Sequence, residues 1–470
     1  MLKPKLTRVS LALMGILISA VVKAGSFSLY TESNGYSIGN FAAGVAAEAY
    51  DASTAWYNPA GLVLLHKQQM ILGGVGVLPS SSLSGTSQFI TFQAPVPPYT
   101  QSFQNLNGAE NGFVPSFYYA KPLSSLATFA VSVTAPFGLS TNWDPNSPLR
   151  YGATLSAMQS VDISPELGWK LNDHVAVGAG PDFQYAKVKF NSVLGAPALL
   201  ADPDPTEWDS ASNNEGDSWG FGFHTGILVM FHENHTRIGL NYQSKVSHTF
   251  HGTSQLTGPL ADPSGAFALD SVFTSDSLVS NNIQFPYIVT LSGYQDVNEK
   301  LAVLSSLVFS GWNSFKTIEL DNVAGFNATS YQPELIDFIS TENYRNAWRV
   351  ALGANYRVND QWMLRLGGGY DQTPTINAER TIRMPDADRW AVSIGGHYQP
   401  YSQIVIDAGY AYLQSIDGSS IDSTINPTVH KTIPLGDLNQ FSVNAKGHAY
   451  ANVFGAQITW LIDKSKYEKS

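Results

Sequence analysis

The chain has 470 residues, and its 26 basic and 37 acidic residues give a formal net charge of −11 at pH 7, which argues against nucleic acid as a partner. Only 13% of the residues are charged, whereas a soluble domain usually carries about 25%. The sequence contains no cysteine, which excludes disulfides, thiolate metal sites and a cysteine nucleophile.

The N-terminus has the pattern of a secretory signal peptide. Three basic residues precede an apolar run over 9–22 that is too short to span a bilayer comfortably, and small residues around Ala24 supply a cleavage site. No later stretch approaches the roughly 18 consecutive apolar residues of a transmembrane helix. We therefore predict a signal peptide over 1–24 and a mature chain that begins near Gly25.

Residues 25–65 precede the first expected strand and are too many for a simple lead-in. We expect Asn40 to cap a short Ala-rich helix over 41–50. The tripeptide Asn58-Pro59-Ala60 follows, and its proline holds Asn58 extended and lacks a donor, so it predicts a fixed turn. Water channels carry a similar tripeptide, but on half-helices of an all-helical membrane protein, which this sequence does not predict.

Two-residue alternation is clearest in three segments, 348–356, 362–370 and 390–398. In each segment every second residue is apolar or glycine, and the apolar stripe begins with Trp and ends with Tyr. Membrane strands of a β-barrel have this outward apolar stripe between two aromatic girdles. A soluble sandwich would bury its apolar face and would have no reason to repeat the aromatic ends. The alternation therefore predicts a transmembrane β-barrel.

The number of strands follows from the turns and loops. Short turns are expected near 122–123, 172–173, 233–234, 298–299, 359–360 and 400–401. Long polar segments lie at 79–111, 140–156, 193–217, 252–280, 321–343, 373–388 and 416–446. Six inner turns and seven outer loops predict a 14-stranded antiparallel barrel over 66–462, with both termini in the periplasm. A short charged tail follows over 463–470.

Several segments resemble the FadL/TodX family of outer-membrane channels. The resemblance includes Asn58-Pro59-Ala60 just before the first strand, together with 113–122, 285–286 and 311–315. It is most specific over 365–390, which contains Tyr-Asp-Gln-Thr-Pro and Pro-Asp-Ala-Asp-Arg-Trp. The resemblance implies that residues 25–65 form a hatch that plugs the barrel. It also implies passive uptake of long-chain fatty acids or other hydrophobic molecules across the bacterial outer membrane.

The resemblance also implies an inward kink in strand three that opens the wall sideways. The matching residues are Pro136, which cannot donate a ladder hydrogen bond, and Gly138, which tolerates the backbone of a bulge. The alternative reading is that Pro136 simply ends strand three below its loop. The two residues are our candidates for a lateral opening.

A fatty-acid carboxylate that leaves water needs a cationic partner. The family's pocket uses an arginine near the top of strand five, where residues 191–192 are uncharged here, and a lysine before strand ten, where we find only Arg345. Lys187 and Lys189 share parity with Tyr185, so unless a bulge intervenes they point outward, towards lipopolysaccharide phosphates. These three cations are the possible carboxylate contacts. Because none of them clearly faces the lumen, an uncharged aromatic compound remains an alternative substrate.

Two outer segments, 193–217 and 252–280, carry many apolar side chains for external loops. Exposed apolar patches usually mark a binding surface, and the resemblance implies an outer groove that first captures substrate. The alternative is that the two segments pack on each other as a lid. The groove candidates are Leu199, Leu200, Trp208, Phe267 and Phe273.

Charged residues inside the barrel are expected to form ion pairs rather than to contact substrate directly. The residues concerned are Arg349, Arg357, Arg365, Arg389, Asp371, Asp386 and Asp388. His232 and His235 form a weak HxxH pattern, so we expect no metal site. No motif implies a cofactor or an energy source.

These observations together predict a passive channel in which substrate passes from an outer groove to an inner pocket and then leaves past the hatch through strand three. The expected partners are a hydrophobic small molecule, outer-membrane lipid and lipopolysaccharide. An aromatic-hydrocarbon channel of the same family and a surface receptor or adhesin that acts through its loops remain alternatives. A rim hydrolase is disfavoured because no nucleophile motif is present, so no enzyme activity is expected. A non-specific porin is disfavoured because the hatch would obstruct it.

Overall fold

A computed structural model describes residues 29–92, 96–200, 204–427 and 439–462. The predicted signal peptide, the first residues of the predicted hatch and the charged tail lie outside the described residues.

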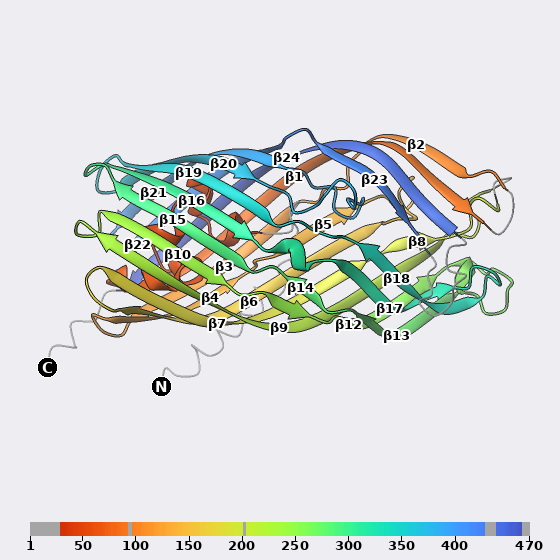
Figure 1. The fold of residues 1–470 in the computed structure, drawn as a ribbon, viewed down its shortest axis with the longest axis horizontal. Helices are drawn as coiled ribbons and strands as arrows, with labels where there is room; N and C mark the ends of the chain where they lie inside the picture. Colours follow the sequence, from red (N-terminus) through yellow and green to blue (C-terminus); the bar gives the residue numbers. More distant parts are fainter. Residues whose placement is uncertain (1–28, 93–95, 201–203, 428–438, 463–470) are drawn as a thin grey trace.

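The strands form one closed antiparallel barrel (Figure 1). β1 (Gln68–Thr91) pairs with β24 (Asn439–Ile462) along its whole length, and with β3 (Gly112–Pro122) on its other side, so the ring has no free edge. The ring continues through β4 (Ala127–Thr134), β6 (Leu155–Lys170), β7 (Val175–Phe190), β9 (Ser210–Phe231), β10 (Thr236–Gln243), β15 (Ile288–Asp296), β16 (Leu301–Ser310), β19 (Ala347–Arg357), β20 (Trp362–Asp371), β21 (Arg389–Tyr401) and β22 (Ile404–Ser415). The 14-stranded barrel predicted from the sequence is confirmed.

At one end the strands are joined by six short turns, as predicted, at 123–126, 171–174, 232–235, 297–300, 358–361 and 402–403. At the other end the prediction of long loops is largely wrong, because several polar segments continue as strands. These are the upper parts of β1, β9 and β24, together with β2 (Tyr99–Leu106), β12 (His251–Thr257), β13 (Val272–Ser280), β17 (Thr317–Phe326), β18 (Pro333–Thr341) and β23 (Ser419–Ile425). These strands lie beyond the expected bilayer, where no lipid requires an apolar stripe, so the alternation that identifies the lower strands is absent there.

The outer surface carries an apolar band between aromatic residues. Leu366, Val392 and Ile394 are more than half exposed and point away from the lumen. Above them the rings of Tyr287, Phe309 and Trp348 form a continuous chain with centroid distances of 5.9 and 4.6 Å. Below them Trp362 stacks on Tyr398 at 4.2 Å, and these rings form part of the second girdle.

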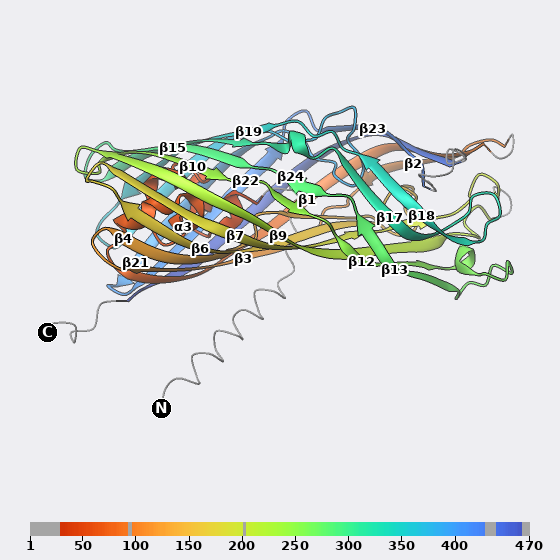
Figure 2. The ribbon, with the colours of Figure 1, turned by 60° about the horizontal axis from the view of Figure 1, so that its bottom comes forward.

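The segment 29–65 is folded inside the barrel near the end with the short turns (Figure 2). Its elements are η1 (Thr31–Ser33), η2 (Ser37–Asn40), α2 (Val45–Glu48), α3 (Thr54–Tyr57) and η3 (Pro59–Leu64). None of the described helices is long and apolar enough to cross a membrane. Nearly every residue of the segment is buried, so it forms the hatch that the fold prediction required.

The helix predicted over 41–50 is wrong. Asn40 ends η2, Phe41 and Ala42 have positive φ, and α2 begins only at Val45. The backbone N–H groups of Gly44 and Ala46 donate instead to serine hydroxyls of the wall, at 2.8 and 3.2 Å. Contacts with the barrel therefore replace the hydrogen bonds that a local helix would have made.

Short elements complete the wall: β5 (Gly138–Asn142), β8 (Ser192–Leu194), β11 (Val246–His248), β14 (Ile283–Phe285), η4 (Pro259–Ala261) and η5 (Trp312–Ser314). Of these, β5, β14 and η5 matter most for the site, because they surround the point where strand three is interrupted.

Candidate functional site

The tripeptide Asn58-Pro59-Ala60 fastens the hatch to the wall. The Asn58 amide donates to the carbonyl of Ala46 in the hatch at 2.7 Å and to that of Ile227 in β9 at 3.1 Å, and its Oδ1 accepts from Ala60 N at 3.1 Å. A Cβ on Gly226 would lie 2.0 Å from this Oδ1. The sequence predicted only a fixed turn, whereas the motif also acts as a clamp on a glycine of the wall.

Replacing Gly226 with Val should loosen this clamp, because the new side chain would occupy the position of the Asn58 amide. We expect the variant to conduct ions in planar bilayers more than the wild type does. Gly396→Val is a matched control, because a Cβ there meets only one atom, at 4.0 Å, and faces away from the lumen. Equal conductance in Gly226→Val and wild type would show that the clamp does not hold the plug.

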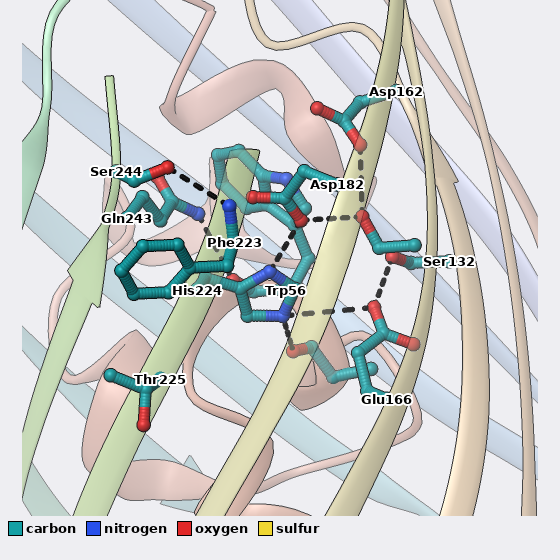
Figure 3. Close-up of polar contacts among 12 residues, drawn as sticks. Trp56, Ser132, Asp162, Glu166, Asp182, Phe223, His224, Thr225, Gln243 and Ser244 are labelled. Carbon is teal, nitrogen blue, oxygen red and sulfur yellow. Dashed lines mark hydrogen bonds and ion pairs between the residues drawn. The ribbon is translucent and has the colours of Figure 1, made fainter. Parts of the chain in front are cut away.

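A buried polar cluster attaches the hatch to strands β4, β6, β7 and β9 (Figure 3). His224 Nδ1 lies 2.6 Å from Asp182 Oδ1, and its Nε2 lies 3.2 Å from the carbonyl of Ala55 in α3. Both ring nitrogens therefore face acceptors. Only the imidazolium form, in which both nitrogens carry a proton, can donate to both of them. The nearby carboxylates of Asp162 and Glu166 are buried with it, so the one cation offsets part of their charge.

The opposite wall holds the hatch through a second polar cluster. Arg365 is fully buried and pairs with Asp407 at 2.7 Å, and Tyr50 donates to the same carboxylate at 3.1 Å. Gln457 donates to Asp51 at 2.7 Å. Arg365 therefore forms an interior ion pair, but with Asp407 rather than with one of the expected partners, and this pair also binds the plug.

The ion pairs nearer the outer rim agree with the predicted pairs only in part. Arg389 pairs with Asp371 at 2.9 Å and lies 3.6 Å from Asp386. Arg349 donates instead to the carbonyl of Phe41 at 2.6 Å, so it too contacts the hatch.

Strand three is interrupted between β4 and β5. β4 pairs with β3 only through residues 117–122 of β3, and β5 pairs with β6 but forms no ladder with β3. Residues 112–116 of β3 therefore have a partner on one side only, in β1. Pairing across the interruption resumes at a single bridge between Ala109 and Thr141. The wall thus has a gap in its hydrogen bonding between β3 and β5.

The backbone at this gap is satisfied from inside the barrel. Pro136 has no N–H, and its carbonyl accepts from Leu29 N of the hatch at 2.9 Å. Phe137 N and O both bond to the Ser160 hydroxyl, at 2.9 and 2.8 Å. The Phe137 ring lies 4.9 Å from that of Phe285 in β14. The chain therefore bends into the lumen at this point, and Gly138 then begins β5.

Two cavities lie behind the bend. The gap cavity contains about 810 Å³ of empty space including its mouth. It is bordered by β5, by Gly108 and Ala109, by residues of β1, β22 and β24, and by the segment 384–389. The inner cavity contains about 460 Å³. The inner cavity is lined mainly by Leu139, Met158, Val188, Phe190, Phe250, Ile283, Phe285, Phe315, Ile318, Tyr344 and Met384.

Residues 15–461 match the family described as outer membrane protein transport protein (OMPP1/FadL/TodX). The chain belongs to this family. The long-chain fatty acid transport protein of Escherichia coli K12 is 26% identical, with 87% of this chain and 92% of that protein covered. Outer membrane protein P1 of Haemophilus influenzae is 26% identical, with 96% and 98% covered. This family member is therefore a transport protein of the bacterial outer membrane.

Solved structures of the family share the fold. A FadL homologue from Pseudomonas aeruginosa has a TM-score of 0.75 and 22% identity, with 93% of this chain and all of that one covered (100%). The toluene transporter TodX of Pseudomonas putida has a TM-score of 0.60 and 15% identity, with 93% and 98% covered. Because these relatives have been named for two chemical classes of substrate, the choice between them depends on the residues of this chain.

One candidate binding residue of this FadL/TodX-family protein is not indicated by the sequence patterns. Arg383 is 6% exposed and lines the inner cavity. It donates to the Ser156 hydroxyl at 2.9 Å, lies 5.0 Å over the Phe338 ring, and makes no ion pair among the described residues. The polar composition of 373–388 predicts an outer loop, whereas the alternating Ile382 and Met384 are the signal that indicates burial.

Among the described residues, Glu342 is the one acid that lines the inner cavity, and it is a weak partner for Arg383. Burial raises the pKa of Glu342 to about 7, although the Ser340 hydroxyl donates to it at 2.8 Å. Burial also lowers the pKa of Arg383 to about 10, so this guanidinium stays charged at neutral pH. A cationic group without a full counter-charge therefore lies beside apolar walls.

The cations chosen from the sequence lie elsewhere. Lys187 and Lys189 are on the outward face of β7, and both pair with Glu215 of β9, Lys189 at 2.7 Å. Arg345 pairs with Asp388 at 3.0 Å near the upper rim. None of the three lines the inner cavity or the gap cavity. Among the described residues no group of three or more His, Asp or Glu is arranged to hold a metal ion.

The apolar residues chosen in the outer segments are partly brought together. Trp208 stacks on Phe267 with centroids 4.4 Å apart, and Tyr331 from a third segment lies 5.1 Å from Trp208. Phe273 is half-buried against the same cluster, whereas Leu199 and Leu200 lie in the segment before Trp208. This packing is compatible with either a capture groove or a lid.

Replacing Trp208 and Phe273 with Ser distinguishes these alternatives. Each lost apolar contact removes at most about 1.5–3 kcal/mol of burial, so capture of a hydrophobic substrate should slow at limiting concentration. Initial uptake into proteoliposomes measures the effect. Unchanged uptake at limiting substrate would show that the cluster is a lid.

Proposed function

We propose that this family member is a passive channel for long-chain fatty acids. The observation that carries the proposal is Arg383, a buried guanidinium that lies beside the apolar inner cavity and makes no ion pair with any residue the structure describes. A carboxylate is the natural partner of a guanidinium, because the two can form charge-assisted hydrogen bonds. The apolar walls then suit the acyl chain, which gains about 0.8 kcal/mol for each CH₂ removed from water.

The alternative substrate is an uncharged aromatic hydrocarbon, and a specific observation favours it. The rings of Phe285, Phe315 and Tyr344 are among those that line the inner cavity. They belong to a continuous chain of tilted, edge-to-face and stacked ring contacts that also includes Phe137 and Trp312. An arene would fit against these rings but would leave Arg383 desolvated without a counter-charge, which is unfavourable. We therefore place the fatty acid first.

The proposed route leaves the barrel sideways. Substrate is captured by the outer aromatic cluster, enters the inner cavity and reaches the outer leaflet through the gap beside Pro136 and Gly138. The way straight down is blocked by the hatch, and the space beneath it is lined by charged residues such as Glu48, Asp51 and Arg237. A polar, water-accessible space offers an acyl chain no burial. Outer-membrane lipid then receives the chain, and we keep lipopolysaccharide phosphates as the partners of the cations outside β7.

Replacing Arg383 with Met tests the substrate class. Loss of hydrogen bonds to a charged group costs about 1.5–3 kcal/mol, so fatty-acid affinity should fall roughly 10- to 150-fold. Toluene uptake should change little, because an arene does not use the charge. Binding is measured in detergent and uptake in proteoliposomes, with Arg345→Met as the matched control outside the cavities. A variant that binds fatty acid as tightly as wild type, or no uptake of either substrate by wild type, would contradict the proposal.

A further inference from the structure

The inner cavity and the gap cavity meet at two side chains. Of the residues that the structure describes, only Leu139 and Met384 line both cavities. The inner cavity shares no lining residue with the polar cavity beneath the hatch. A molecule in the inner cavity is therefore separated from the gap by a partition of two side chains.

The two residues of this partition differ in how firmly their backbones are held and in how easily their side chains rotate. Leu139 belongs to β5 and pairs with Met158 of β6, so its backbone is held by the sheet. Met384 lies between β20 and β21, in a segment held by a turn and by side-chain contacts rather than by a ladder. Methionine is unbranched, with three rotatable bonds, and adapts readily to its surroundings.

A single polar contact holds the Met384 side chain where it closes the partition. The Tyr344 hydroxyl donates to its sulfur at 3.1 Å. A thioether is a weak acceptor, so this contact is easily exchanged for another. Both Met384 and Leu139 are 5% exposed, so in this structure the partition is closed.

We propose that Met384 is the gate between the inner cavity and the lateral gap. This rests on the proposed function, because it requires both cavities to lie on one path. Rotation of the side chain away from Leu139 joins the two cavities, and the opening is then about as wide as one thioether chain. A flexible linear chain passes such an opening more easily than a bulky branched or polycyclic molecule, so the gate also contributes to specificity.

The absence of cysteine from the chain permits a direct test. In Met384→Cys the single thiol is modified with methyl methanethiosulfonate, which restores a side chain close to methionine in size, or with benzyl methanethiosulfonate, which fills the partition. Met363→Cys is the matched control, because Met363 lines the polar cavity beneath the hatch. Modification is confirmed by mass spectrometry, and Met384→Trp supplies similar bulk without a reagent.

We expect the benzyl adduct at position 384 to lower fatty-acid uptake into proteoliposomes by about tenfold or more, which requires only about 1.4 kcal/mol of added barrier. The methyl adduct should transport normally, reductant should reverse the benzyl block, and binding in detergent should persist. The benzyl adduct at position 363 should transport like wild type.

Three results would overturn the proposal, and they separate it from the proposed function. Normal uptake by the benzyl adduct at 384, with uptake still stopped by changes at Pro136 and Gly138, would leave the lateral route intact and remove the gate. Loss of binding together with uptake would mean that Met384 shapes the inner cavity rather than separating two steps. A block at 363 but not at 384 would place the route beneath the hatch and would contradict both.

Discussion

Removing residues 25–60 from the mature chain should convert the closed barrel into an ion-conducting pore. The wall does not need the hatch for closure, because β1 and β24 pair along their whole length. The hatch instead fills the lumen and is fixed at both walls, through Ala55 at His224 and through Tyr50 at Asp407. Without it, the buried charges of the wall become hydrated, and water and ions gain a continuous path.

Planar-bilayer recordings measure this effect. The intact protein should stay nearly closed, and the deleted protein should show a steady, ohmic conductance. Resistance of the folded barrel to denaturation in detergent at room temperature serves as the folding control. If both proteins conduct equally, the segment does not plug the lumen, and the route straight down is open again.

Closing the gap in strand three should abolish uptake while binding remains. In the double variant Pro136→Val/Gly138→Val the missing N–H returns, and β-branched residues suit the pleat, so β5 should pair with the free edge of β3. The inner cavity and Arg383 are unchanged, so substrate should still bind. The expected uptake is that of protein-free liposomes.

The control is Pro165→Val combined with Gly396→Val. It repeats the two substitutions at outward positions of the wall, where Pro165 is already paired with β4 and Gly396 is paired on both sides. This variant should transport normally. Transport by the Pro136→Val/Gly138→Val variant at the wild-type rate would mean that substrate leaves by another route, most simply past the hatch.

The parts of the fold that the sequence predicted are those on which the bilayer acts. Lipid requires an apolar outward stripe, so the alternation in 348–356, 362–370 and 390–398 indicated membrane strands. Lipid also requires a closed sheet, and the number of short turns indicated how many strands close it. Strands above the bilayer bury their inner faces but face water rather than lipid on the outside, so they lack the apolar outward stripe and their sequences predict loops. The helix expected at 41–50 failed because contacts with the wall determine the backbone there.

The site was less predictable for a similar reason. The family motif located Pro136 and Asn58, but the clamp at Gly226 depends on a contact 168 residues away in the chain. Arg383 lay inside the best-matching run, yet only the infolding of 373–388 places it beside the inner cavity. Lys187 and Lys189 were the more obvious cations, and strand parity already indicated that they face outward.

The most direct test of the account is the structure of the protein with a bound fatty acid that carries bromine at its terminal carbon. We expect the carboxylate at Arg383 and the bromine anomalous signal inside the inner cavity, towards Met384 and Leu139. Bromine beneath the hatch near Arg237, or a carboxylate outside the lumen at Lys187 and Lys189 with the inner cavity empty, would contradict it.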